Sequence, residues 1–141
     1  MNRTRSARTA LLLAGALALS GSLRAHETGG TVLLSPNATT VCYEGEECEI
    51  HWVTEERGTL CIEAAVGGHD KGILNDCATP AQRGRWLWHV PRGFVSGFGP
   101  AISREVRVAL YPAEREGERI VSPPFTIRAR RDSEPPRRRK K

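Results

Sequence analysis

The segment VCYEGEECEIHW, residues 41–52, decides how the fold of this chain is interpreted. It holds two of the four cysteines, one of the four histidines and one of the three tryptophans. That composition fits a metal site, a redox site or a disulfide-closed turn. Cys48, Ile50 and Trp52 alternate with residues of the opposite face, which is the period of a half-buried strand. We therefore predict a hairpin turn at Gly45 that leads into a core strand ending near Trp52.

The same alternation recurs along the chain. It marks residues 60–66, 86–90, 106–110 and 125–129 as half-buried strands, and residues 31–34 add a first strand. Gly and Pro lie between these segments, and residues 73–82 form at most a short helical turn. We predict an all-β fold, an immunoglobulin-like antiparallel β-sandwich of about seven strands, with a small Greek-key barrel as the alternative. Trp86 and Trp88 share one strand face and are expected in the core rather than stacked on a sugar.

Residues 1–25 have the three parts of a secretory signal peptide. Basic residues near Met1 are followed by an apolar run of about 11 residues, shorter than the ~20 that span a bilayer, and then by small residues. We predict Sec-dependent export to the periplasm or the medium, with no transmembrane segment after cleavage. Cleavage after Ala25 makes His26 the mature N-terminus, while cleavage after Ser20 or Ser22 stays open. Residues 26–127 then form one domain.

The cysteines are predicted to form disulfides, because their number is even and the chain carries an export signal. They are Cys42, Cys48, Cys61 and Cys77. Three pairings are possible, and sequence proximity favours Cys42–Cys48 together with Cys61–Cys77. The first bond would close the hairpin, and the second would tie a strand to a loop over residues 67–78.

Zinc is the competing interpretation, since Cys48 and His51 carry zinc-binding groups three positions apart. On a strand, side chains at that spacing point to opposite faces. Thiols in an oxidising compartment also form disulfides. The sequence therefore disfavours a metal at the cysteines. The redox motif Cys-x-x-Cys is absent, and we predict no cofactor.

A copper site at the mature N-terminus is the alternative function. The amine and imidazole of His26 could chelate Cu(II), with a second imidazole from His51, His69 or His89. The start of the mature chain resembles that of small periplasmic copper carriers, which share an immunoglobulin-like sandwich. Their Asp-x-His motif and methionine ligands have no counterpart here, because the single methionine is Met1. We therefore keep periplasmic copper binding as the alternative.

Positive charge is concentrated at the C-terminal end. Residues 128–141 contain eight Arg or Lys against two acids, whereas residues 26–127 contain nine basic and fourteen acidic residues. The net charge of +5 therefore gives no indication of nucleic-acid binding. Residues 128–141 are predicted to be a disordered tail. The predicted binding residues are its last five, Arg137, Arg138, Arg139, Lys140 and Lys141, and the expected partner is an envelope protein or an anionic glycan or lipid head group.

The order of the cysteines resembles that of a family of small exported proteobacterial proteins of unknown function. The residues that carry the resemblance are Ser35-Pro36, Cys42, Cys48-Glu-Ile-His-Trp52, Leu60-Cys61-Ile62, Cys77 and the Arg-rich end. The fourth cysteine departs from the family because it precedes Ala78 rather than an aromatic residue. The resemblance implies a periplasmic four-cysteine β-domain with no known activity.

A second resemblance covers nearly the whole mature domain. Gly45–Trp52, Trp88-His-Val-Pro91 and Ser122-Pro-Pro-Phe-Thr-Ile127 are similar to motifs of an immunoglobulin-like module. That module belongs to Ser/Thr-rich wall-anchored proteins of the type involved in yeast β-1,6-glucan assembly. It implies a sandwich without catalytic activity.

No catalytic motif accompanies these features. The sequence lacks a Gly-x-Ser-x-Gly elbow, and the clustered glutamates are expected to form a solvated acidic face. They are Glu44, Glu46, Glu47, Glu49, Glu55 and Glu56. We predict a monomeric, non-catalytic exported domain that binds or supports a component of the cell envelope.

Overall fold

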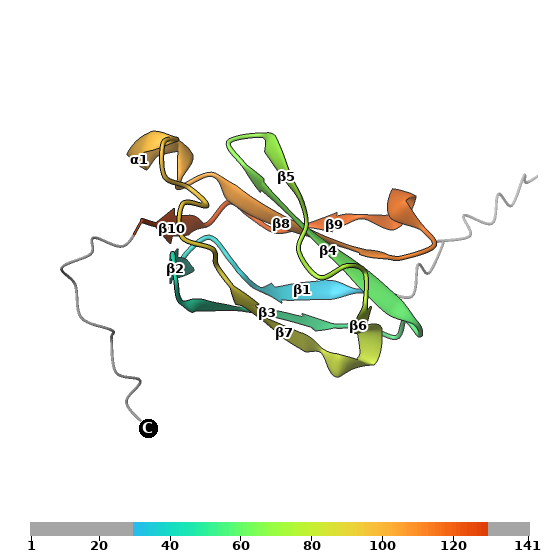
Figure 1. Cartoon of the computed structure of the whole chain (residues 1–141). Coiled ribbons are helices and arrows are strands. Elements are labelled where there is room, and N and C mark those ends of the chain that lie inside the picture. Colours follow the sequence, from blue (N-terminus) through green and yellow to red (C-terminus); the bar gives the residue numbers. More distant parts are fainter. Residues whose placement is uncertain (1–29, 130–141) are drawn as a thin grey trace, which may run out of the picture.

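Strands make up almost all the regular structure of this protein in the computed structural model, which describes residues 30–129. The elements are β1 (Val32–Ser35), β2 (Val41–Tyr43), β3 (Glu47–Val53), β4 (Thr59–Val66), β5 (His69–Ile73), β6 (Thr79–Pro80), η1 (Ala81–Arg83), β7 (Arg85–His89), α1 (Gly99–Ile102), β8 (Val106–Pro112), η2 (Glu116–Glu118), β9 (Ile120–Val121) and β10 (Thr126–Arg128). The fold is an all-β sandwich, as predicted (Figure 1).

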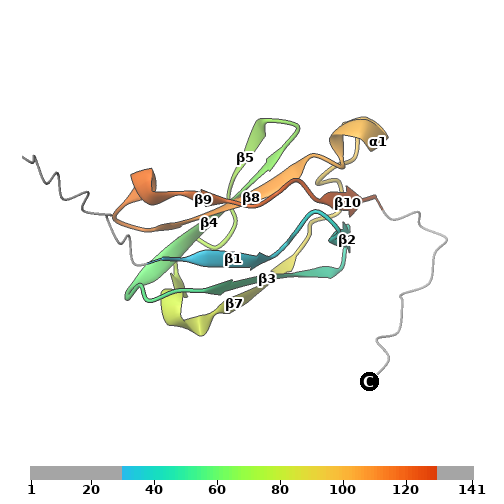
Figure 2. The ribbon, with the colours of Figure 1, turned by 180° about the vertical axis from the view of Figure 1, so that it is seen from behind.

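Two antiparallel sheets form the layers of the sandwich. One has the order β1-β3-β7, and the other has the order β5-β4-β8-β9, with β6 beside β4. The strands β4 and β8 pair from Leu60–Pro112 to Val66–Val106 and form the centre of the second sheet. The strands β2 and β10 pair in parallel at one end of the sandwich, where α1 also lies (Figures 1 and 2).

The core contains the side chains that alternate inward along the predicted strands. Cys48, Ile50 and Trp52 of β3 are buried, and the indole N–H of Trp52 donates to the carbonyl oxygen of Ala81 at 2.7 Å. Trp88 of β7 is also buried, and its ring meets the ring of Phe94 edge to face, with centroids 4.8 Å apart. A buried indole needs a partner for its N–H, and Ala81 supplies one for Trp52.

Trp86 is half-buried and packs against the same core. The prediction that Trp86 and Trp88 are core residues rather than a sugar-stacking pair is therefore confirmed. His51, on the opposite face of β3, is exposed as predicted.

Four strands, β2, β5, β6 and β9, were not predicted. Residues 67–78, expected as a loop, contain β5, which pairs with β4 after a turn at Gly67 and Gly68. Four of the five residues of β5 are exposed, so the strand has no apolar alternation to reveal it. The strands β2, β6 and β9 have only two or three residues. In the range 73–82, the helical structure is limited to the start of η1.

Within residues 30–129, no helix is long and apolar enough to cross a membrane. The predicted signal peptide lies outside the described residues, as does the predicted tail except for Arg128 and Ala129.

Candidate binding site

Each disulfide ties a strand to a neighbouring segment of the chain. Cys42–Cys48 joins β2 to β3 across their turn, with Cα atoms 5.6 Å apart. Cys61–Cys77 joins β4 to the segment after β5, with Cα atoms 3.9 Å apart. This is the pairing that sequence proximity favours. Because all four sulfur atoms are bonded in pairs, none is a thiolate that could bind zinc.

The histidines considered as copper ligands are not brought together. His51 lies opposite Arg85, and His89 lies opposite Glu47 on the same pair of strands. These positions are four residues apart along β3, which is roughly 13 Å at the rise of a strand. At most one of the two could therefore join His26, which lies outside the described residues. Between residues 30 and 129, no cluster of three His, Cys, Asp or Glu side chains could hold a metal ion.

Glu44 is buried, contrary to the prediction that it belongs to a solvated acidic face. It retains only 4% exposure, and its carboxylate accepts hydrogen bonds from the segment after β7. The backbone N–H of Val95 donates to Oε1 at 2.7 Å and that of Ser96 at 3.1 Å. The hydroxyl of Ser96 donates to Oε2 at 3.1 Å. Among the other five glutamates, Glu47, Glu49 and Glu55 are exposed, as predicted.

The hydrogen bonds of Glu44 keep it ionised. Burial raises the pKa of its carboxyl group, but the N–H groups of Val95, Gly93 and Ser96 together with the Ser96 hydroxyl outweigh that effect. The pKa therefore lies below the ordinary value of 4.5. A buried carboxylate held by several N–H donors is a fixed contact, and here it fixes the 93–97 segment against the β2–β3 hairpin.

The 93–97 segment forms one wall of a cavity of about 410 Å³ at this end of the sandwich. The lining residues are Val95, Ser96, Gly97, Gly99, Pro100, Ser103, Arg104, Thr126, Arg128 and Ala129. They come from the loop around α1 and from β10, and none of them is acidic. This cavity is our candidate binding site, and its basic members are Arg104 and Arg128.

Backbone pairing brings these two arginines to the same cavity although they are distant in sequence. Val106 and Phe125 form an antiparallel bridge, and the N–H of Ile127 donates to the carbonyl oxygen of Ser103 at 3.0 Å. Arg104 directly follows Ser103, and Arg128 directly follows Ile127. Both arginine side chains are exposed, and Ala129, which follows β10, also lines the cavity.

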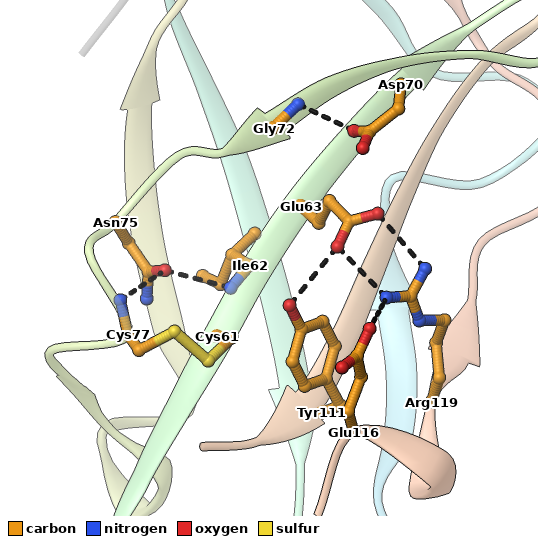
Figure 3. Close-up of polar contacts among 10 residues, drawn as sticks. All are labelled: Cys61, Ile62, Glu63, Asp70, Gly72, Asn75, Cys77, Tyr111, Glu116 and Arg119. Carbon is orange, nitrogen blue, oxygen red and sulfur yellow. Dashed lines mark hydrogen bonds and ion pairs between the residues drawn. A yellow bond between two sulfur atoms is a disulfide. The ribbon is translucent and has the colours of Figure 1, made fainter.

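A second polar cluster lies on the outer face of β4 and β8 (Figure 3). Arg119 donates to both carboxylate oxygens of Glu63 at 3.0 Å and to Glu116 at 3.0 Å. The hydroxyl of Tyr111 donates to Glu63 at 3.2 Å. The pKa of Tyr111 is raised above 10.0, chiefly by burial and next by the hydrogen bond to the Glu63 carboxylate and its negative charge. Because Arg119 is paired with Glu63 and Glu116, we interpret this cluster as a stabilising contact of the sheet rather than as a ligand site.

Asn75 closes the gap between β5 and β6 along the edge of β4 (Figure 3). Its side-chain oxygen accepts the N–H of Ile62 at 2.8 Å, and its amide donates to the carbonyl oxygen of Leu60 at 2.8 Å. The amide also donates to the Thr79 hydroxyl at 2.9 Å. The Asn75 side chain thus forms the backbone hydrogen bonds with β4 that a neighbouring strand would otherwise form. The Cys61–Cys77 disulfide joins the same two segments.

One feature of the sequence indicates that Glu44 is buried, and it did not enter the prediction. In β2, Cys42 is buried, and period two along the strand places Glu44 on the same inward side. Nothing in the local sequence pairs Arg104 with Arg128, because their proximity follows from the tertiary pairing. The five predicted binding residues, 137–141, lie outside the described residues.

No family model matches the chain, and no curated protein is similar to it. The resemblance to the four-cysteine family therefore stays a prediction. Among solved structures, this chain is similar to the fibronectin(III)-like modules of CbhA from Clostridium thermocellum, with a TM-score of 0.41 and 14% identity. The match covers 72% of this chain and 100% of that one. Likeness at this level says nothing about function.

Proposed function

We propose that this chain is a non-catalytic, exported domain that binds an anionic component of the cell envelope through its basic C-terminal end. The two disulfides support export, because such bonds persist in oxidising compartments. Cys42–Cys48 closes the β2–β3 hairpin, and Cys61–Cys77 ties β4 to the segment that follows β5. The oxidised chain is therefore cross-linked at two separate places in the sandwich.

The observation that carries the proposal is the position of the positive charge. Residues 30–129 contain ten basic and thirteen acidic residues, while residues 130–141 add seven basic and two acidic ones. In the sequence, the basic segment follows Ala129, which lines the cavity together with Arg104 and Arg128. Each basic side chain near an anionic membrane contributes about 1 kcal/mol of attraction. An acidic domain with one basic end is therefore suited to contact an anionic surface in one orientation.

A vesicle sedimentation assay tests this function. The mature chain is mixed with vesicles of phosphatidylcholine alone or with phosphatidylglycerol added, over a series of salt concentrations. We expect binding only to the anionic vesicles, weakening as the Debye length falls from about 10 Å at 0.1 M to 3 Å at 1 M salt. A variant ending at Ala129 should bind at least tenfold less.

The matched control changes the charge of the tail in the other direction. Replacing the two tail acids, D132N with E134Q, should strengthen binding to the anionic vesicles. The proposal is wrong if the shortened variant binds as well as the mature chain and if salt has no effect on either.

A further inference from the structure

We propose that the cavity between the α1 loop and β10 is a binding site for one phosphate group, held between Arg104 and Arg128. The inference deepens the proposed function and rests on it in part, because the phosphate would belong to a head group at the envelope surface. It goes further in assigning a defined site on the folded domain, in addition to the diffuse attraction of the tail.

The lining has the chemistry that phosphate requires. A guanidinium group presents N–H donors in a planar fork that matches two oxygens of a phosphate. Arg104 and Arg128 supply two such forks, and the cavity lining contains no acidic residue. Its volume of about 410 Å³ lies in the range of small-molecule sites, so a phosphorylated head group fits as well as a free ion.

The two guanidinium groups are available to a ligand. Among residues 30–129, neither guanidinium group has a hydrogen-bond or ion-pair partner, whereas Arg115 and Arg119, in the connection between β8 and β9, are paired with glutamates. Glu44 lies behind Ser96 of the lining, but its carboxylate is already engaged. The N–H groups of Val95 and Ser96 hold it, which gives it a structural role.

The part of the lining that contains Val95, Ser96, Gly97 and Gly99 is fixed and open. Glu44 holds it from one side. From another side, the ammonium group of Lys71 on β5 lies 5.3 Å from the ring centroid of Phe94 and 4.9 Å from that of Phe98. Gly97 and Gly99 have positive φ, and a side chain added at either would meet nothing within 4 Å. A ligand could therefore approach this backbone closely.

The test compares two pairs of arginines in the full mature chain. The site variant is R104Q with R128Q. The matched control is R83Q with R85Q, which removes the same charge from two exposed arginines that also have no partner within the described chain. The control pair lies around η1 and the start of β7, away from α1 and β10 (Figure 1). All four side chains are exposed, and circular dichroism should show that both variants fold.

Sedimentation with vesicles that contain phosphatidic acid should separate the two variants. We expect the site variant to bind roughly 10- to 30-fold more weakly than the wild type, because two arginines no longer attract the phosphate. The control variant should bind less than about threefold more weakly. Equal weakening by both variants would overturn the site, because net charge alone would then explain the binding. The proposed function would survive that result. The proposed function is wrong, independently of the site, if the wild type binds anionic and neutral vesicles equally.

A soluble probe distinguishes the source of the phosphate. In NMR titrations with glycerol phosphate, we expect the amide signals of Gly97 and Gly99 to shift in the wild type and not in the site variant. Such shifts together with vesicle binding support a lipid head group. Shifts without vesicle binding support a soluble phosphate ester at the same site. The absence of shifts at these glycines, with vesicle binding intact in the site variant, refutes the proposal.

Discussion

The carboxylate of Glu44 gives the sharpest prediction about stability. We expect Glu44→Ala to destabilise the fold and to release the wall of the candidate binding site. Glu44→Gln should have a smaller effect, because the amide oxygen can still accept the same N–H groups without the negative charge. Glu49→Ala, on the exposed face of β3, is the matched control, since it removes the same charge from the surface.

The magnitude follows from the donors that lose their acceptor. In Glu44→Ala, the N–H of Val95 is left in a buried position and that of Ser96 in a partly buried one. An unsatisfied buried donor costs about 1–3 kcal/mol, and water reaches the second more easily. We expect a total loss of about 2–4 kcal/mol in the free energy of unfolding. In urea, this corresponds to a decrease in the midpoint of roughly 1–3 M.

The effect should depend on pH in a defined direction. The pKa of Glu44 is lowered by folding from the ordinary value of 4.5. Its contribution is therefore complete above pH 4.5 and is lost as the pH falls through the folded-state pKa. Urea unfolding at pH 7 and at decreasing pH measures this, and the difference between wild type and Glu44→Ala should narrow in acid. A loss at pH 7 within about 0.5 kcal/mol of that for Glu49→Ala, in the usual range of surface changes, would refute the reasoning.

Three further predictions concern the second sheet and its edge. Asn75→Ala leaves the N–H of Ile62 in β4 without its acceptor and should cost about 1–3 kcal/mol, with faster hydrogen exchange at that N–H as the check. Replacing Cys61 and Cys77 by serine should cost about 3 kcal/mol in the chain-entropy model, more than loss of the hairpin disulfide, because the sequence separation is 16 rather than 6. Urea unfolding of the two serine variants measures that difference. Ultraviolet titration should show Tyr111 ionising above pH 10.0. Because folding raises the pKa of Tyr111, its contribution to stability is complete below pH 10.0 and is lost as the pH rises through the folded-state pKa, and Tyr111→Phe should abolish that change.

The sequence predicts the strands that have one buried face well, and it misses the strands that are very short or exposed on both faces. Cys48, Ile50 and Trp52 alternate because β3 has one buried face and one exposed face, so the period is readable. The strand β5 lies at the edge of its sheet and is exposed on both faces, so its sequence has no such period. Backbone pairing with β4 forms it, and that pairing leaves no trace in residue type.

The candidate site was less predictable because its parts meet only in the folded chain. A charged side chain in a turn, next to Gly45, is ordinarily solvated. The N–H groups that donate hydrogen bonds to Glu44 belong to a segment about fifty residues further along the sequence. Arg104 and Arg128 have no local motif in common. A basic C-terminal end was evident from composition, while the cavity beside it required the pairing of β10 with its neighbours.

The two ends of the described chain leave the sandwich at opposite ends (Figure 2). Gly30 lies in a depression with Pro112 and Gly117, near the turn between β8 and β9. Ala129 lies on the rim of the phosphate cavity. This polarity has a practical consequence for surface-based measurements. Attachment of the protein to a sensor through residues before Gly30 would leave the cavity facing the solution, whereas attachment at Ala129 would place the sensor next to the cavity lining and mask a genuine ligand.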